Sequence, residues 1–208
     1  MQLITRAFLE TGTDYCLSPE VWLAAQAASQ MTGAVRLKDV ARIVSNQSTP
    51  PEGERYVLDT GNAREGFLDI PVLGDLVSTR TSAKKIAEEG DVIISRLRPY
   101  LRQVTQIPSG IGDILGQTRF YCSTEFMVIR RLDGKNSAGL VAWLLSPPVQ
   151  EMLSQAATGG HHPRIHADLL LDAPVDPTYL DEGLADSISN VLSQHIQGQS
   201  NLRILLRH

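Results

Sequence analysis

The stretch Gly90–Arg102, GDVIISRLRPYLR, decides how the middle of the chain folds. Its run of β-branched residues, Val92–Ile94, predicts a short strand, because such side chains favour a pleated backbone. Four polar side chains then follow at even spacing: Arg96, Arg98, Tyr100 and Arg102. In an extended segment these four would share one face, although Pro99 can interrupt the pattern.

Three guanidinium groups and a phenol on one face suit the phosphates and base edges of a nucleic acid. The alternative is a solvated basic edge strand, whose charges protect against aggregation. The distribution of charge favours nucleic acid, although the net charge of the chain is −4. Residues 80–131 carry nine basic and five acidic side chains, which makes this span +4 and leaves −8 for the remainder. A local field of this kind matters more for docking than the total charge.

Length and composition indicate a globular chain with one substantial core. It has 208 residues, 42% of them hydrophobic and 20% charged. No apolar run reaches the roughly 18–20 residues that span a bilayer, and the N-terminal segment lacks the pattern of a secretory signal. Cys16 and Cys122 have no CxxC partner, which predicts free thiols and a cytoplasmic location.

Local patterns along the chain predict a mixture of strands and helices. Ser18, Pro19 and Gly33 bound a helix over 19–30, and residues 45–54 form a polar loop. Segment 35–44 can be a helix or a strand. Further strands are predicted over 55–59, 76–79, 92–94, 125–130 and 169–175, and further helices over 140–145 and 146–157. The fold class is therefore α+β, a β-rich domain with interspersed helices.

The C-terminal segment is predicted to form a long helix. Its spacings of four and three residues define a heptad seam, interrupted by His195 and Gly198. The apolar members of this seam are Leu184, Ile188, Val191, Leu202 and Leu205. The seam can pack the helix on its own domain, or it can pair the helix with another copy or another subunit.

The segment Gly159–Arg164 offers a second candidate binding element. Gly159 and Gly160 allow backbone N–H groups to approach a phosphate, and His161, His162 and Arg164 add donors. A surface loop without function is the alternative. Zinc binding by the histidines is disfavoured, because no Glu or Cys lies at a metal-ligand offset nearby.

Catalytic motifs are missing from the sequence, which has no GxSxG, P-loop or GxGxxG pattern. One rival function is a metal-dependent nuclease that uses Asp91, Glu125 and the group His161, His162 and His166. Another is an adaptor or inhibitor whose acidic remainder binds a basic protein. Without a metal role, Glu125 can pair with a nearby arginine or accept a hydrogen bond from cytosine N4.

Five segments, taken in order, resemble the target-recognition domain of the DNA-specificity subunit of type I restriction–modification systems. They are Asp14–Glu20 (DYCLSPE), Val35–Pro50, Glu88–Val104, Cys122–Arg131 and Ala157–Pro177. The resemblance implies a target-recognition domain over residues 1–176 and a spacer or dimerisation helix over 177–208. The usual subunit has two such domains and two long helices, whereas this chain has room for one of each, as in a half-subunit that pairs with a second copy. The alternatives are a part of a longer subunit, or a single-domain reader that serves another methylation-based defence system.

The resemblance also implies a bacterial or archaeal DNA-binding subunit in phage defence, without catalytic activity or a cofactor of its own. A partner adenine methyltransferase would use S-adenosylmethionine, and a restriction subunit can join the complex. Phosphate contacts are expected from Lys84, Lys85, Arg102 and the Gly159-Gly160 segment. Base contacts are expected from Arg96, Arg98, Tyr100, Gln117 and Arg119.

Overall fold

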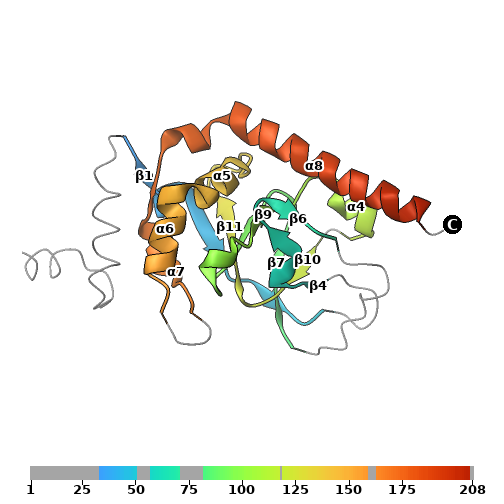
Figure 1. Cartoon of the computed structure of the whole chain (residues 1–208), viewed down its shortest axis with the longest axis horizontal. Coiled ribbons are helices and arrows are strands. Elements are labelled where there is room, and N and C mark those ends of the chain that lie inside the picture. Colours follow the sequence, from blue (N-terminus) through green and yellow to red (C-terminus); the bar gives the residue numbers. More distant parts are fainter. Residues whose placement is uncertain (1–32, 51–56, 71–81, 118, 159–162, 207–208) are drawn as a thin grey trace, which may run out of the picture.

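The computed structural model describes residues 33–50, 57–70, 82–117, 119–158 and 163–206. It confirms the α+β class (Figure 1). The strands are β1 (Val35–Arg36), β2 (Ala41–Val44), β3 (Gln47–Ser48), β4 (Val57–Leu58), β5 (Ala63–Arg64), β6 (Phe67–Leu68), β7 (Lys84–Ala87), β8 (Val92–Ser95), β9 (Val104–Gln106), β10 (Phe120–Cys122), β11 (Phe126–Arg131) and β12 (Pro174–Val175). The α-helices are α3 (Leu37–Val40), α4 (Ile111–Leu115), α5 (Gly139–Leu145), α6 (Pro147–Gln155), α7 (Ala167–Asp172) and α8 (Glu182–Leu205), and the 3₁₀ turns are η1 (Thr60–Asn62), η2 (Pro99–Leu101) and η3 (Pro177–Leu180).

Two four-stranded sheets form the centre of the molecule. The first has the order β2-β11-β8-β9 and is antiparallel throughout. The second has the order β3-β7-β10-β4, with a parallel pair between β10 and β4. Short two-stranded pairs, β1-β12 and β5-β6, complete the pattern. Figure 1 shows α5, α6 and α7 grouped on one side of the strands, while α8 runs along the top.

The strand predicted at Val92–Ile94 is confirmed as β8, and it lies in the middle of the core. Val92 and Ile94 belong to a hydrophobic cluster formed with side chains of α5, α6 and α7. Ile93 faces the opposite cluster, together with residues of the second sheet and Ile196 of α8. Alternate side chains of a strand point to opposite faces, and both faces are buried here. This explains why β8 is a continuous apolar run.

The expectation that Arg96, Arg98, Tyr100 and Arg102 share one face of an extended strand is wrong. The strand ends at Ser95, and η2 begins at Pro99. Arg98 and Arg102, which flank η2, have φ values of 50° and 51°. The fixed φ of Pro99 suits the start of such a turn, so the chain reverses direction and returns as β9, antiparallel to β8.

Two segments with ambiguous patterns resolve into mixed structure. Residues 35–44 contain both expected elements, with the short helix α3 between β1 and β2. The predicted strand over 169–175 is wrong for its first part, because α7 extends to Asp172 and only Pro174–Val175 is strand. Leu170 is buried in the core from α7, so the apolar run Leu169–Leu171 serves a helix rather than a sheet.

The predicted helices over 140–145 and 146–157 are confirmed as α5 and α6. Ser146 lies at the N-cap of α6, as expected, but its hydroxyl donates to the carbonyl of Trp143 at 2.7 Å instead of capping the helix. The indole N–H of Trp143 donates to the carbonyl of Pro174 at 2.9 Å. This bond ties α5 to β12, close to the start of the C-terminal segment.

The predicted C-terminal helix is confirmed as α8, which follows η3. Asp181 is the N-cap of α8, and its carboxylate accepts from the N–H of Leu184 at 2.9 Å. None of the described helices has the length and apolar character needed to cross a membrane. The predicted helix over 19–30, the predicted strand over 76–79 and the first residues of the predicted strand over 55–59 lie outside the described residues.

Candidate nucleic-acid interface

Three segments that are distant in sequence meet at the end of β8. The N–H of Arg96 donates to the carbonyl of Glu125 at 2.9 Å, and the carbonyl of Arg96 accepts from the N–H of Ile165 at 2.9 Å. Arg98 continues the contact, since its N–H donates to the carbonyl of Pro163 at 2.8 Å. The central motif and the closing motif of the sequence therefore form one surface, with the turn before β11 beside them.

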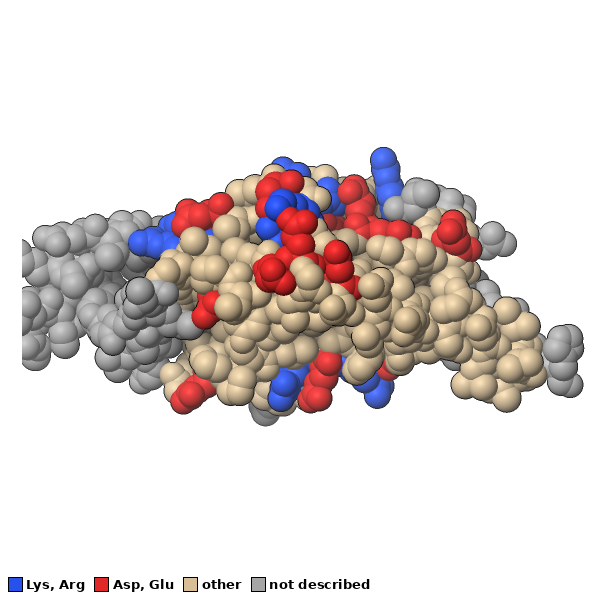
Figure 2. All heavy atoms as spheres, turned by 90° about the horizontal axis from the view of Figure 1, so that it is seen from above, with Lys and Arg blue, Asp and Glu red and all other residues tan. Residues whose placement is uncertain are grey.

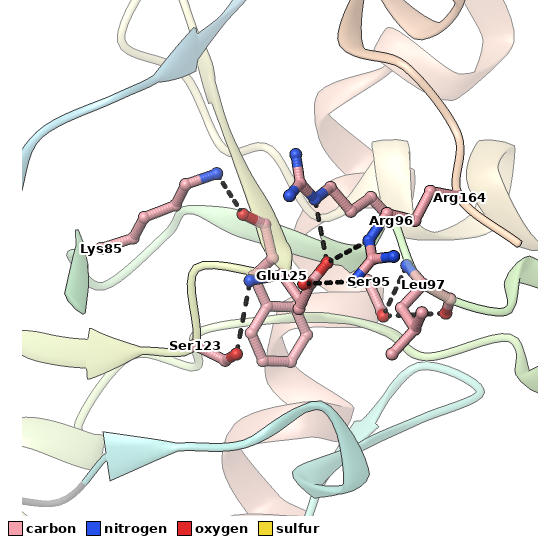
Figure 3. A network of polar contacts seen from close by, with 8 residues as sticks. Lys85, Ser95, Arg96, Leu97, Ser123, Glu125 and Arg164 are labelled. Carbon is pink, nitrogen blue, oxygen red and sulfur yellow. Dashed lines mark hydrogen bonds and ion pairs between the residues drawn. The ribbon is translucent and has the colours of Figure 1, made fainter. Parts of the chain in front are cut away.

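An acidic side chain joins two arginines on this surface (Figure 3). Glu125 accepts from Nε of Arg96 at 2.9 Å, and from Nε and Nη2 of Arg164 at 3.2 and 2.9 Å. The hydrogen bonds from Arg164, with those from Arg96, hold the pKa of the Glu125 carboxyl at about 2. Glu125 was expected either to pair with an arginine or to accept from cytosine N4, and the structure shows the arginine pair. We call Arg96, Glu125 and Arg164 the Glu125 cluster.

The turn η2 extends the exposed surface beside the Glu125 cluster. Tyr100 is 59% exposed and Leu101 is 45% exposed. Arg98 is half-buried, as is Arg102, whose Nη2 donates to the carbonyl of Leu145 at 3.2 Å. Two non-glycine residues with positive φ on either side of one turn are uncommon, and such backbone strain concentrates at functional sites. Sequence analysis did not identify Leu101 as part of this surface, because no local pattern indicates that an apolar residue after Pro99-Tyr100 is exposed.

The two neighbouring lysines have structural contacts. Lys84 is buried, and its ammonium donates to the hydroxyl of Ser82 at 2.9 Å. Lys85 is half-buried and donates to the carbonyl of Phe126 at 2.6 Å, linking β7 to β11 (Figure 3). Burial lowers the pKa of the Lys85 ammonium, and the nearby charge of Arg96 lowers it further. This placement favours a role in fixing the sheets over the predicted role of contacting phosphates.

Gln117 and Arg119 differ in exposure. The Gln117 side chain is buried, and neither its oxygen nor its nitrogen has a hydrogen-bond partner within the described parts of the chain. Arg119 is exposed just before β10. Of these two candidates for base contacts, Arg119 is therefore the accessible one.

The segment Gly159–His162 lies outside the described residues, so the predicted contacts of Gly159, Gly160, His161 and His162 stay predictions. The residues on either side are paired through their backbones. Thr158 N–H donates to the Arg164 carbonyl at 3.0 Å, and Arg164 N–H donates to the Thr158 carbonyl at 2.8 Å. Thr158 is thereby held beside Arg164, a member of the Glu125 cluster.

Part of the basic charge of residues 80–131 is neutralised inside the fold. Arg130 makes two contacts to Asp91, at 2.7 and 2.8 Å, and Arg131 contacts Asp133 at 2.6 Å. Asp91 is only 2% exposed. These arginines hold the end of β11 that is remote from Glu125, so the count of positive charges overstates what this span can offer to a ligand.

The residues of the rival nuclease site do not come together. Asp91 and Glu125 lie at opposite ends of the β8–β11 ladder, which separates them by about 16 Å at the usual rise of a strand. Each is already bonded to arginine. His166 is exposed at the start of α7. Among the residues that the structure describes, no cluster of three or more His, Cys, Asp or Glu could hold a metal ion.

Helix α8 contacts its own domain through a different stripe from the heptad seam. Ala185, Leu192 and Ile196 are buried, and each is one residue, or about 100° around the helix, from a seam position. Gln199 and Arg203 attach the C-terminal part of α8 to the backbone at Leu68–Ile70.

The seam residues themselves are half-buried or exposed. Leu184 and Ile188 are half-buried, while Val191, Leu202 and Leu205 are 55%, 55% and 72% exposed. A groove of about 380 Å³ runs beside the seam, lined by Gly66, Phe67, Val141, Leu145, Ile188 and Val191. His195 interrupts the seam because it serves the domain, packing on Phe67 with ring centroids 4.8 Å apart.

The exposed face of α8 is poor in charge. Residues 187–202 contain no Lys, Arg, Asp or Glu. Figure 2, which views the molecule from the side of α8, shows charged side chains gathered in one part of the surface and a broad uncharged area toward the C-terminal end of the helix. Ion pairs near the start of α8 include Lys135 with Glu182.

No family model and no curated protein matches the chain. Solved structures that are similar to it include the following two. One is a chain from a type I R-M system, described for its complex assembly and conformational transition, with 16% identity and a TM-score of 0.44 over 99% of this chain. The other is the HsdS subunit from Thermoanaerobacter tengcongensis, with 16% identity and a TM-score of 0.41 over 91% of this chain. The chain spans about half the length of each, 52% and 46%.

Proposed function

We propose that the chain is the sequence-specific DNA-binding subunit of a methyltransferase complex and leaves the chemistry to its partners. One observation carries this proposal: the central and closing motifs, about 65 residues apart in sequence, are joined by hydrogen bonds into one exposed surface with Arg96, Tyr100 and Arg164 on it. Arginine donors beside an exposed aromatic ring suit the base edges and phosphates of a duplex.

The partner in this proposal is an adenine methyltransferase that uses S-adenosylmethionine, with a restriction subunit as a further member of the complex. The DNA-binding chain selects the site and holds the duplex while the partner turns a base out of the stack. The resemblance of the five ordered segments supports this division of roles.

Binding of a duplex tests the proposal directly. Fluorescence anisotropy with a labelled pool of duplexes should show binding that weakens steeply as salt rises, because phosphate contacts release counterions. Arg98→Ala should lower the affinity for a selected duplex at least several-fold at fixed salt. Lys135→Ala is the control, since Lys135 lies beyond the opposite end of β11 and pairs with Glu182. Failure of the chain to bind any duplex, alone or with its methyltransferase, would refute the proposal.

We further propose that two copies pair through the seam of α8. An antiparallel pair with its two-fold axis between Ile196 and Gln197 places Leu202 of one copy opposite Val191 of the other, and Leu205 opposite Ile188. Exposed apolar side chains would then cover the groove beside Ile188, and two inverted half-sites would be bound.

Sedimentation velocity separates this pairing from a helix that serves only its own domain. The double variant Ile188→Glu with Leu202→Glu should sediment as a smaller species than the parent chain. Asn190→Glu with Asn201→Glu adds the same charge at exposed positions outside the seam and should leave the mass unchanged. An equal mass for the seam variant and the parent would rule out self-pairing.

A further inference from the structure

The Glu125 cluster contains one arginine whose donors are only partly used. The guanidinium group of Arg96 donates to the Glu125 carboxylate through Nε alone. Its two terminal nitrogens have no hydrogen-bond or ion-pair partner in the described part of the chain, and its side chain is 43% exposed. These two nitrogens form the end of the guanidinium that can donate to two acceptors at once.

The position of Arg96 is held from three directions. Its backbone N–H and carbonyl are both bonded, to Glu125 and to Ile165. Its side chain is held at Nε by Glu125, and Glu125 is held in turn by two bonds from Arg164 (Figure 3). A donor group fixed before the ligand arrives loses little freedom on binding, which favours discrimination between ligands.

Glu125 has no role left as a direct reader of bases. Both of its carboxylate oxygens already accept from arginine, so an acceptor for cytosine N4 would have to break these bonds. The surplus positive charge of the cluster and the free edge of Arg96 point instead to a base with two acceptors side by side. Guanine presents N7 and O6 in the major groove in this arrangement.

We propose that Glu125 is a positioning residue that orients Arg96 to bind the N7 and O6 atoms of a guanine in the target sequence. This inference rests on the proposed function and adds the base class that one residue recognises. Arg164, from the closing motif, fixes the carboxylate, so recognition of this guanine depends on both motifs.

Selection and single-atom probes test the inference. The parent chain is first used to select duplexes from a pool with a randomised core. Each guanine of the selected duplex is then replaced in turn by 7-deazaguanine, which lacks the N7 acceptor, or by inosine, which keeps N7 and O6. At one guanine, 7-deazaguanine should weaken binding by about 5-fold or more, within the range for a bidentate contact, while inosine should change little.

Variants then link this guanine to the cluster. Glu125→Gln should lose most of the discrimination at that position, yet keep its affinity for unrelated duplexes. Asp133→Asn is the matched control, because it removes the same charge from a carboxylate that pairs with Arg131 at the other end of β11, and it should keep the discrimination. Arg96→Lys retains the positive charge but loses the two-pronged donor, so it should behave like Glu125→Gln even if the latter variant does not fold.

The outcomes are distinguishable. If the parent selects no duplex, the proposed function fails. If it selects a duplex but every guanine tolerates 7-deazaguanine, or if Arg96→Lys still discriminates fully, the guanine contact of Arg96 is overturned while the proposed function stands. If Glu125→Gln folds and still discriminates fully, the positioning role of Glu125 is overturned.

Discussion

The ion pair between Arg130 and Asp91 should be one of the main stabilising contacts of the fold. Asp91 is 2% exposed, and it accepts from Nε and Nη2 of Arg130 at 2.7 and 2.8 Å. The same carboxylate also accepts from the N–H of Glu88 at 2.8 Å. Substitution of Arg130 by Met keeps most of the side-chain length while leaving the carboxylate in the protein interior without its cation.

Removal of one partner from a buried ion pair costs about 3–5 kcal/mol, because the remaining charge is uncompensated. Arg130 is itself 28% exposed, so water can reach the site and the lower end of that range, about 3 kcal/mol, is expected. For a chain of this size each kcal/mol lowers the melting temperature by about 2–4 °C. Arg130→Met should therefore melt about 6–12 °C below the parent.

Thermal and urea unfolding of purified variants measure this effect. Lys135→Met removes a cation from an exposed ion pair on the same surface as α8 and should leave the midpoint almost unchanged. Arg130→Met combined with Asp91→Asn should recover part of the loss, because no buried charge is then left unpaired; the other carboxylate that pairs with Arg130, Glu88, is exposed to water. A single variant Arg130→Met that melts within about 2 °C of the parent would show that the pair does not stabilise the fold.

Three further predictions concern buried or paired groups. Gly139→Ala places a Cβ 2.1 Å from the carbonyl oxygen of Tyr179. Urea unfolding should therefore show a free energy of unfolding lower by about 1–3 kcal/mol. An increase of up to about 1 kcal/mol, as helix propensity alone would give, would contradict the clash. Burial raises the pKa of the Cys122 thiol to about 12, so this thiol should resist iodoacetamide near neutral pH until the protein is denatured, as mass spectrometry of its peptide can show. Hydrogen bonds from Arg164 hold the pKa of Glu125 in the folded protein at about 2, below its ordinary value of 4.5. The ionised Glu125 therefore stabilises the fold above pH 4.5, and this contribution is lost as the pH falls toward 2. The melting temperature of Glu125→Gln should approach that of the parent over that range, and a constant gap would count against it.

Some elements could be predicted from local patterns because a single physical cause produces them. The β-branched run of β8 sits between two buried clusters, and the proline pair after Leu145 separates α5 from α6. The long helix α8 followed from the absence of proline and the regular apolar spacing. Prediction failed where two causes competed: Leu169–Leu171 suits a strand or a helix equally well, and in the structure it forms part of α7, from which Leu170 packs into the core.

The candidate site was predicted in part. The even spacing of Arg96, Arg98 and Arg102 drew attention to the segment that forms an exposed surface with the closing motif, although the assumed extended backbone was wrong. The lysines looked equivalent to the arginines in sequence, but Lys84 is buried and Lys85 bonds to a backbone carbonyl. Burial depends on what packs above a residue, and local sequence carries little of that information.

The sequence by itself determined the α+β class, the central strand, the long terminal helix and the concentration of basic residues in the middle of the chain. These properties follow from backbone preference and side-chain periodicity over a few residues. Only the tertiary structure decided which charges are accessible and which are paired, because an ion pair such as Arg164 with Glu125 joins residues 39 positions apart. Long-range packing also separated the two stripes of α8, since one residue of offset turns a side chain by about 100° and moves it from the domain to the surface.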